Sequence, residues 1–289
     1  MANATEAIRE RFTTRPIHAT FGLEISGMDI SRPVDEQTVA ELGGLVSRHK
    51  VLVFKEQTVS SEQLNAFAER FGNTKQEPPA FASNGRRDHN VSRLGNQEDG
   101  DKVVNPLTGY GLVSRFWHSD SSWRPVPTWL TMLAASEIPD EGGGTGFADM
   151  EAAYAALPEE RKAFLDGRHM IHSWATLRRY EPSIPPMEDI APPPATHPLV
   201  RTIDGRKSLF LNGHVCFYVG NMPQDEGEAL FGELMAHATS PQFVYEHKWT
   251  VGDVAMWDNR TTMHRAMPYD RSKRRVMYRA EVQGAEAPR

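Results

Sequence analysis

The chain is divided into short apolar segments separated by turns, and it lacks the regular strand–helix alternation of a parallel α/β sheet. Strand-like segments include VLVF at 51–54, TWLTMLAASEI at 128–138, LVRTI at 199–203, SLFLN at 208–212, VCFYV at 215–219, FVYEHKW at 243–249, DVAMWDN at 253–259 and RRVMYRAEVQG at 274–284. No internal repeat is visible. Many short strands and few helices are typical of a β-sandwich or jelly roll. We therefore expect a mainly β fold with flanking helices and a jelly-roll core.

Other stretches show the apolar spacing of amphipathic helices. They lie at 35–49, 59–72, 150–166 and 224–238. In the second stretch, Ser60 or Ser61 is a candidate N-cap and Gly72 a candidate stop. Because an amphipathic helix buries only one face, we expect these helices to pack on the outside of the β core.

Two long segments show neither the two-residue apolar period of a strand nor the 3.6-residue period of an amphipathic helix. Residues 73–112 are polar and rich in Gly, Asn and Asp. A loop of that length is uncommon unless it is functional or mobile, so we expect an active-site loop or lid around 73–112. Residues 181–198 contain many prolines and predict an irregular, Pro-rich excursion.

Composition narrows the class of protein. The 289 residues carry a net charge of −6 with a pI near 6.0, which argues against a nucleic-acid-binding surface. The start, MANATEAIRERF, lacks the apolar core of a signal peptide, and no window resembles a membrane span. Cys216, the single cysteine, lies in an apolar stretch and predicts a buried structural thiol. We expect a cytoplasmic protein that binds neither nucleic acid nor membranes.

The stretch FWHSDSS at 116–122 contains a His-x-Asp pair, His118 and Asp120. In extended backbone, alternate side chains point to the same face, so an imidazole and a carboxylate at this spacing can meet at one point. An isolated pair of this kind occurs often by chance. A metal site needs further ligands from elsewhere in the chain.

The best candidate for a third ligand is His264, which follows a predicted strand ending in Trp257 and Asp258. A jelly roll brings distant strands together, so a loop after that strand can deliver His264 to the same place. Two histidines and one carboxylate form the facial triad of non-haem Fe(II) oxygenases. The same donors also bind catalytic zinc in hydrolases, and the spacing alone leaves both possibilities open.

The order of several motifs resembles the TauD/TfdA family of Fe(II)- and 2-oxoglutarate-dependent dioxygenases. The motifs are TFGLEISGMDI, VLVFKEQ, HSDSSW, GGGT, WDNR, RSKRRVMYR and RAEVQG, and they extend over almost the whole chain. WHSDSS, FVYEHKW, VGDVAMWDNR and HRAMPYD look closer to the 2,4-D branch than to the taurine branch. The resemblance implies a double-stranded β-helix, or jelly roll, and one dioxygenase domain over residues 1–289.

Carried over residue by residue, the resemblance makes His118, Asp120 and His264 the iron ligands. It places Arg275 on the far carboxylate of 2-oxoglutarate, a task that suits the planar fork of a guanidinium. Thr145, at the end of GGGT, matches the threonine whose hydroxyl assists at that carboxylate. The implied cofactors are Fe(II), 2-oxoglutarate as cosubstrate, and O₂.

The resemblance also indicates residues around the substrate. Arg279 matches an arginine that meets the substrate's anionic group, and it lies an even number of positions after Arg275. Ser114 stands where both named branches carry an asparagine near the substrate, which leaves the primary substrate open. His214 is a further candidate pocket residue, although a structural imidazole is an equal reading. Candidates for orienting the metal loop from behind are Trp257, Asp258 and Asn259.

The implied activity is hydroxylation of a small anionic organic substrate, with succinate and CO₂ as co-products. The best match is an aryloxyalkanoate acid, similar to 2,4-D, cleaved to a phenol and an oxo acid. One alternative is a taurine, alkylsulfonate or sulfate-ester dioxygenase of the same family. Alternatives of other classes are a non-catalytic cupin-like metal-binding protein and a zinc hydrolase, neither of which needs both Arg275 and Thr145. Relatives are commonly oligomers, so we expect a homo-oligomer, a dimer or higher.

Overall fold

The computed structural model describes residues 12–74, 87–96, 114–180, 193–216 and 218–289. Within this part of the chain, the larger sheet has the strand order β1 (Thr13–Pro16), β2 (Leu23–Ser26), β3 (Val51–Phe54), β13 (Val254–Asp258), β6 (Thr128–Glu137), β15 (Val276–Gln283), β5 (Val91–Gly95), β4 (Arg87–Asp88). A smaller sheet has the order β12 (Val244–His247), β7 (Thr145–Asp149), β14 (Thr262–Ala266). The two remaining pairs are β8 (His169–His172) with β9 (Ala195–Pro198), and β10 (Val200–Ile203) with β11 (Arg206–Leu209).

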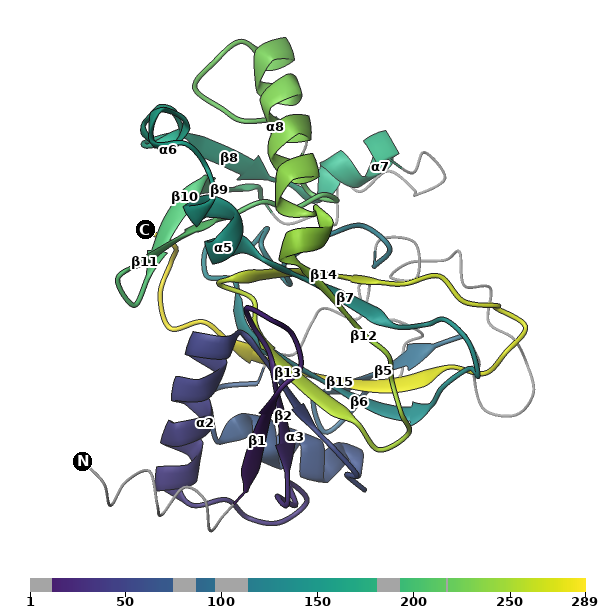
Figure 1. Ribbon diagram of the computed structural model, residues 1–289. Coiled ribbons are helices and arrows are strands. Elements are labelled where there is room, and N and C mark those ends of the chain that lie inside the picture. Colours follow the sequence, from purple (N-terminus) through teal and green to yellow (C-terminus); the bar gives the residue numbers. More distant parts are fainter. Residues whose placement is uncertain (1–11, 75–86, 97–113, 181–192, 217) are drawn as a thin grey trace.

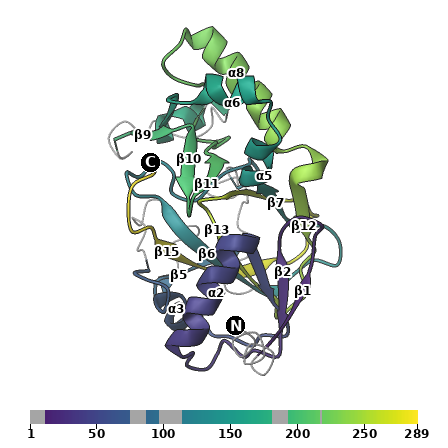
Figure 2. The same ribbon diagram turned by 60° about the vertical axis from the view of Figure 1, so that its left-hand side comes forward.

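Helices cover the outside of these sheets. Helices α2 (Glu36–His49) and α3 (Ser61–Glu69) lie at one end of the molecule, and α5 (Met150–Ala155), α6 (Glu159–Leu165) and α8 (Gln224–Ala238) lie at the other (Figures 1 and 2). The short helices are α7 (Leu177–Tyr180) and the 3₁₀ turns Trp174–Thr176 and Pro241–Phe243. No helix in the described ranges is long and apolar enough to cross a membrane. The mainly β architecture with flanking helices confirms the predicted fold class, and its paired sheets are those expected of a jelly-roll core.

The two faces of the larger sheet have different partners. On β13, Val254 and Met256 pack toward the core under helices α2 and α3, whereas Ala255 and Trp257 pack toward Phe147 of the smaller sheet. The same alternation continues on β3, β6 and β15, as the two-residue period of a strand requires. We call the side that faces the smaller sheet the inner face.

Several element boundaries differ from the sequence expectation. The helix predicted over 150–166 is interrupted before Pro158, which precedes the first residue of α6 and has no N–H to continue the α5 hydrogen-bonding pattern. VCFYV forms no strand in its described residues: Val215 lies in a turn, Cys216 directly follows it, and Val219 forms only an isolated bridge with Met170. Val215 and Cys216 are nevertheless fully buried. Burial raises the pKa of the Cys216 thiol well above its usual value, which fits the predicted structural role.

The two long segments fall partly outside the described residues. Of the proposed lid around 73–112, the structure describes 73–74 and 87–96, and the latter contain the unanticipated strands β4 and β5. The rest of that segment lies outside the described residues. Of the Pro-rich range 181–198, residues 181–192 also lie outside them, and β9 occupies the end that was expected to be irregular.

Helix α3 begins with a capping box that provides a stability test. The Ser60 hydroxyl accepts from the Gln63 N–H (3.1 Å), and the Gln63 side-chain oxygen accepts from the Ser60 N–H (2.9 Å). Replacing Ser60 with Ala should lower the free energy of unfolding by about 1 kcal/mol. The matched control Ser61→Ala, at the first helical position, should change it much less in chemical denaturation. Equal effects would contradict the capping role of Ser60.

Candidate metal centre and surrounding pocket

Two histidines from distant parts of the chain pair through their backbones. His264 lies on β14, and His118 forms an isolated antiparallel bridge with it. The His118 N–H donates to the His264 carbonyl (2.9 Å), and the His264 N–H donates to the His118 carbonyl (2.8 Å). The two ring centroids are consequently only 4.1 Å apart. His264 therefore lies on a strand, β14, and not on the loop that the sequence predicted after the strand ending at Asp258.

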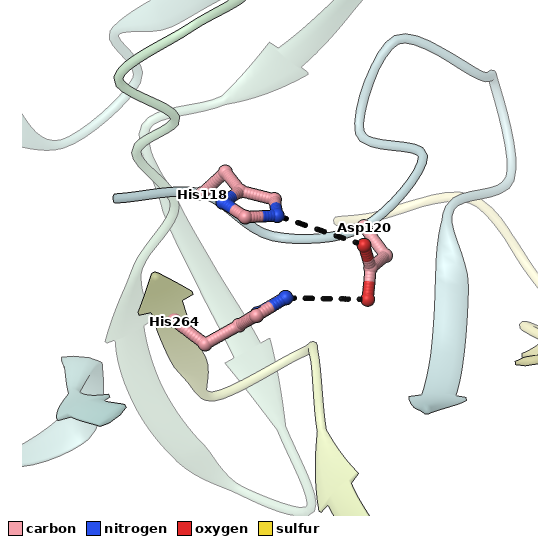
Figure 3. A group of neighbouring side chains, drawn as sticks. All are labelled: His118, Asp120 and His264. Atoms are coloured by element: carbon pink, nitrogen blue, oxygen red, sulfur yellow. Dashed lines mark ion pairs between the residues drawn. The ribbon is translucent and has the colours of Figure 1, made fainter. Parts of the chain in front are cut away.

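Asp120 completes the cluster with the two imidazoles (Figure 3). Its Oδ1 lies 3.8 Å from His118 Nε2, and its Oδ2 lies 3.5 Å from His264 Nε2. One ligand atom from each of the three residues lies within 4.8 Å of the others, and all three side chains are buried. The structure thus brings together the three residues that the sequence indicated as metal ligands.

Burial favours the neutral form of both imidazoles, which is the form that binds metals. It lowers the pKa of His118, an effect that the negative charge of Asp120 opposes. It lowers the pKa of His264 well below the usual value, and the neighbouring His118 acts in the same direction. His118 Nδ1 lies 2.7 Å from the Phe116 carbonyl, so a proton on Nδ1 leaves the Nε2 lone pair facing Asp120. Two such nitrogens and a carboxylate oxygen fit Fe(II).

The backbone from His118 to Asp120 is not the regular strand that the His-x-Asp spacing suggested. His118 forms an isolated bridge, and a turn begins at Asp120. Asp120 and Ser121 lie in the turn, and Ser121 has a positive φ of 52°. The turn is held from two sides, by Ser119 Oγ donating to the Thr262 carbonyl (2.9 Å) and by Asn212 Nδ2 donating to the Ser119 carbonyl (2.9 Å). The side chains converge through this anchoring, although the backbone is irregular.

Trp257, Asp258 and Asn259 were expected to orient the loop that carries His118 and Asp120, and two of them contact the cluster. Asn259 Oδ1 accepts from the Asp120 N–H (3.0 Å) and from Trp257 Nε1 (3.2 Å). The Trp257 ring also packs on His264, with centroids 4.7 Å apart. Asp258 does not contact the cluster in this way: it forms an ion pair with Arg260 and accepts from Trp129 Nε1. Asn259 therefore contacts Asp120 and Trp257 contacts His264, whereas Asp258 interacts with Arg260 and Trp129.

Arg275 and Thr145 belong to a second group of buried polar residues, beside the GGGT turn. Arg275 Nε donates to the Gly143 carbonyl (3.1 Å), within the GGGT turn that ends at Thr145. The Arg275 backbone is fixed by Asn96, whose Oδ1 accepts from its N–H (3.0 Å). Arg275 is 8% exposed, and among the described residues no carboxylate forms an ion pair with it. A buried cation without an acidic partner is suited to an anionic ligand.

The other sequence-indicated residues lie at different distances from the cluster. Arg279, 6% exposed, places one guanidinium nitrogen 3.8 Å from Asp120 Oδ1. The His214 ring centroid lies 4.8 Å from that of His118, and its Nδ1 is buried without a hydrogen-bond partner among the described residues. Ser114 is half-buried, and its carbonyl accepts from the Ala266 N–H on β14. Its hydroxyl forms no hydrogen bond with His118, Asp120 or His264.

Three residues near these groups were not anticipated from the sequence. Thr131 Oγ1 donates to Asp120 Oδ2 (2.6 Å), and Glu281 is its cross-strand neighbour, 5% exposed. Trp249 Nε1 donates to Thr145 Oγ1 (3.0 Å). Counting by twos along β15 from Arg279 would have placed Glu281 on the inner face. Thr131 and Trp249 had no comparable signal, because each lies in a segment that reads as an ordinary buried strand.

Comparison with known proteins agrees with this geometry. Residues 13–280 match the family model described as "Taurine catabolism dioxygenase TauD, TfdA family". The chain is 37% identical over 280 residues to an alpha-ketoglutarate-dependent 2,4-dichlorophenoxyacetate dioxygenase of Cupriavidus pinatubonensis, a match that covers 92% of this chain and 95% of the relative. It is 33% identical to a (S)-phenoxypropionate/alpha-ketoglutarate-dioxygenase of Sphingobium herbicidovorans, covering 96% of each. The crystal structure of AAD-2 in complex with Mn(II) and N-oxalylglycine is similar, with a TM-score of 0.88, 34% identity, and coverage of 96% and 99%.

The cluster predicts a divalent metal site that depends on its side chains. Replacing Asp120 or His264 with Ala should weaken Mn(II) binding by at least about 100-fold, because even residues that only support a ligand typically contribute tenfold or more. The matched control is His237→Gln, which alters a histidine on α8 that bonds to the Ala153 carbonyl. Titration followed by the electron paramagnetic resonance of free Mn(II) measures the affinity. Unchanged binding in the Ala variants would place the metal elsewhere.

Proposed function

The chain belongs to the TauD/TfdA family, as an α-ketoglutarate-dependent dioxygenase that uses Fe(II) and O₂, and we propose that its substrate is an aryloxyalkanoic acid. Two kinds of support combine. Relatives that match nearly the whole chain are named for 2,4-dichlorophenoxyacetate and phenoxypropionate. The observation that carries the substrate class is Arg279, a buried guanidinium 3.8 Å from Asp120, which offers a small organic anion a partner next to the metal centre.

In the proposed site, His118, Asp120 and His264 hold the iron. When bound, the iron supplies the activation of O₂ that couples decarboxylation of 2-oxoglutarate to substrate hydroxylation. The protein itself positions the reacting molecules and excludes water. All three ligands are at most 7% exposed, and this burial keeps solvent away from the reacting atoms.

Arg275 and Thr145 are proposed to hold the far carboxylate of 2-oxoglutarate. Arg275 uses Nε on the Gly143 carbonyl, which leaves its terminal nitrogens for a carboxylate. Thr145 Oγ1 already accepts from Trp249 Nε1 (3.0 Å), so its own proton is available for donation. Both groups lie in the buried interior, where a charge-assisted hydrogen bond is stronger than in water.

Arg279 is proposed to bind the substrate carboxylate, with His214 and Ser114 at the pocket wall. Anchoring the acid group presents the carbon between the carboxylate and the ether oxygen for hydroxylation. One oxygen atom of O₂ enters that carbon, and the other enters succinate. The resulting hemiacetal loses the phenol, leaving an oxo acid, so the products are a phenol, an oxo acid, succinate and CO₂.

The wider organisation is proposed on the family resemblance. Residues 1–289 would form one dioxygenase domain, and the family match over 13–280 supports this extent. We also propose that the protein is a cytoplasmic homo-oligomer, a dimer or higher. Light scattering coupled to size-exclusion chromatography measures the mass in solution, and a monomer across working concentrations would refute the assembly.

The iron and cosubstrate sites have a direct spectroscopic test. Anaerobic addition of Fe(II) and 2-oxoglutarate should give the weak visible metal-to-ligand charge-transfer band in the wild-type protein. His264→Ala should abolish the band by removing an iron ligand, and Arg275→Ala should weaken it by lowering cosubstrate affinity, about 10- to 100-fold for one lost charge-assisted pair. A folded, iron-loaded wild type without the band would refute the proposed site and favour a non-catalytic metal-binding protein.

The substrate class is tested by product analysis and by one arginine. With phenoxyacetate, the enzyme should release a phenol in step with succinate. Arg279→Ala should raise the KM for the acid about 10- to 100-fold while the anaerobic charge-transfer band persists. Arg274→Ala is the matched control, since that neighbouring arginine is exposed and pairs with Glu137. Sulfite or sulfate release from a sulfonate or sulfate ester, without phenol release from phenoxyacetate, would favour the alternative family activity.

A further inference from the structure

Asp120 faces the two histidines with both of its carboxylate oxygens. Oδ1 lies 3.8 Å from His118 Nε2, and Oδ2 lies 3.5 Å from His264 Nε2 (Figure 3). Neither oxygen is excluded by distance from a metal ion held between the two imidazoles. A carboxylate can bind a metal through one oxygen or through both. The number of positions left open in the proposed iron site depends on which of these Asp120 adopts.

Thr131 distinguishes the two oxygens. It lies on β6 between Leu130 and Met132, which pack toward the helices, and its own side chain is on the inner face. Its hydroxyl donates to Asp120 Oδ2 over 2.6 Å, a length typical of an O–H donor on a charged carboxylate. This hydrogen bond occupies one lone pair of Oδ2, withdraws electron density from that oxygen, and fixes the plane of the carboxylate.

Asn259 fixes the direction in which the Thr131 hydroxyl donates. Asn259 Nδ2 donates to Thr131 Oγ1 (2.9 Å), so the single proton of the hydroxyl remains for Asp120. The amide cannot be reversed, because its Oδ1 accepts from two N–H groups, those of Asp120 and the Trp257 ring. Thr131 and Asn259 are both at most 1% exposed, so water does not compete for these bonds.

We propose that the Thr131 hydroxyl, oriented by Asn259, restricts Asp120 to a single metal-ligating oxygen. This inference rests on the proposed iron site. Two imidazole nitrogens and one carboxylate oxygen leave three of six positions open. A chelating cosubstrate would take two of them, which would leave the third for O₂. If both oxygens of Asp120 bound, the cosubstrate complex would have no position left. Thr131 is thus a positioning residue that preserves the O₂ position.

The test counts the water that holds the third position in a stable complex. Mn(II) with N-oxalylglycine, a 2-oxoglutarate analogue, should leave one exchangeable water on the metal in the wild type. That water raises the longitudinal relaxation rate of solvent protons. Thr131→Val keeps the shape of the side chain but removes the hydroxyl, and we expect loss of this inner-sphere relaxivity. Thr131→Ser retains the hydroxyl and should restore it.

Controls separate the possible failures. Thr128→Val makes the same change at another buried position on β6, and it should leave the relaxivity unchanged. A wild-type relaxivity in Thr131→Val, with Mn(II) and N-oxalylglycine bound, would overturn the role of Thr131 while leaving the metal site intact. A wild type that binds no Mn(II) would instead overturn the proposed site itself. If Thr131→Val does not fold, Thr131→Ala removes the same hydroxyl, and its relaxivity decides between the same two outcomes.

Discussion

Two backbone hydrogen bonds between His118 and His264 connect the segment around residue 118 to strand β14. Each bond is of ordinary strength, but together they hold the backbones of His118 and His264 side by side, which fixes the starting points of both side chains. Asp120 then needs only a short turn to reach them, and that turn is held by Asn259 and by Thr262 through Ser119. The metal centre is therefore a product of strand pairing. Any change that separates β14 from residue 118 would move His264 away from His118 and Asp120.

The larger sheet supports stability and chemistry with the same strands. Its outer face is apolar and packs on α2 and α3, through residues such as Leu130 and Met132 of β6. Its inner face mixes apolar residues with Thr131 and Arg279. Because side chains alternate along a strand, residues of the core under the helices lie next in sequence to Thr131 and to Arg279. Precision of placement is expected where a site is built on strands rather than on loops.

The sequence was most informative where a motif combined unusual residue types at fixed spacing. The His-x-Asp pair and His264 were candidates from residue type and spacing, and the resemblance to the TauD/TfdA family added Arg275. The structure brings His118, Asp120 and His264 together. Strand β14 was missed, since TTMHRAM contains too many polar residues to show an apolar period. VCFYV failed in the opposite way, because an apolar run in a buried turn cannot be told from a strand by its composition. Thr131 was invisible to sequence reasoning, because its partner Asp120 is fixed only by the tertiary structure.

The burial of Arg275 bears on the proposed cosubstrate site. Burial lowers the pKa of this guanidinium from its usual value, and the nearby Tyr269 only opposes that effect. The protein thus bears the desolvation cost of a cation that, in the described part of the chain, contacts the Gly143 carbonyl and the Tyr269 ring. A carboxylate that enters this space regains that energy as a charge-assisted pair, whereas a neutral molecule of the same shape does not. In the proposed cosubstrate site, a preference for an anion would therefore be built into the folded state before any ligand arrives.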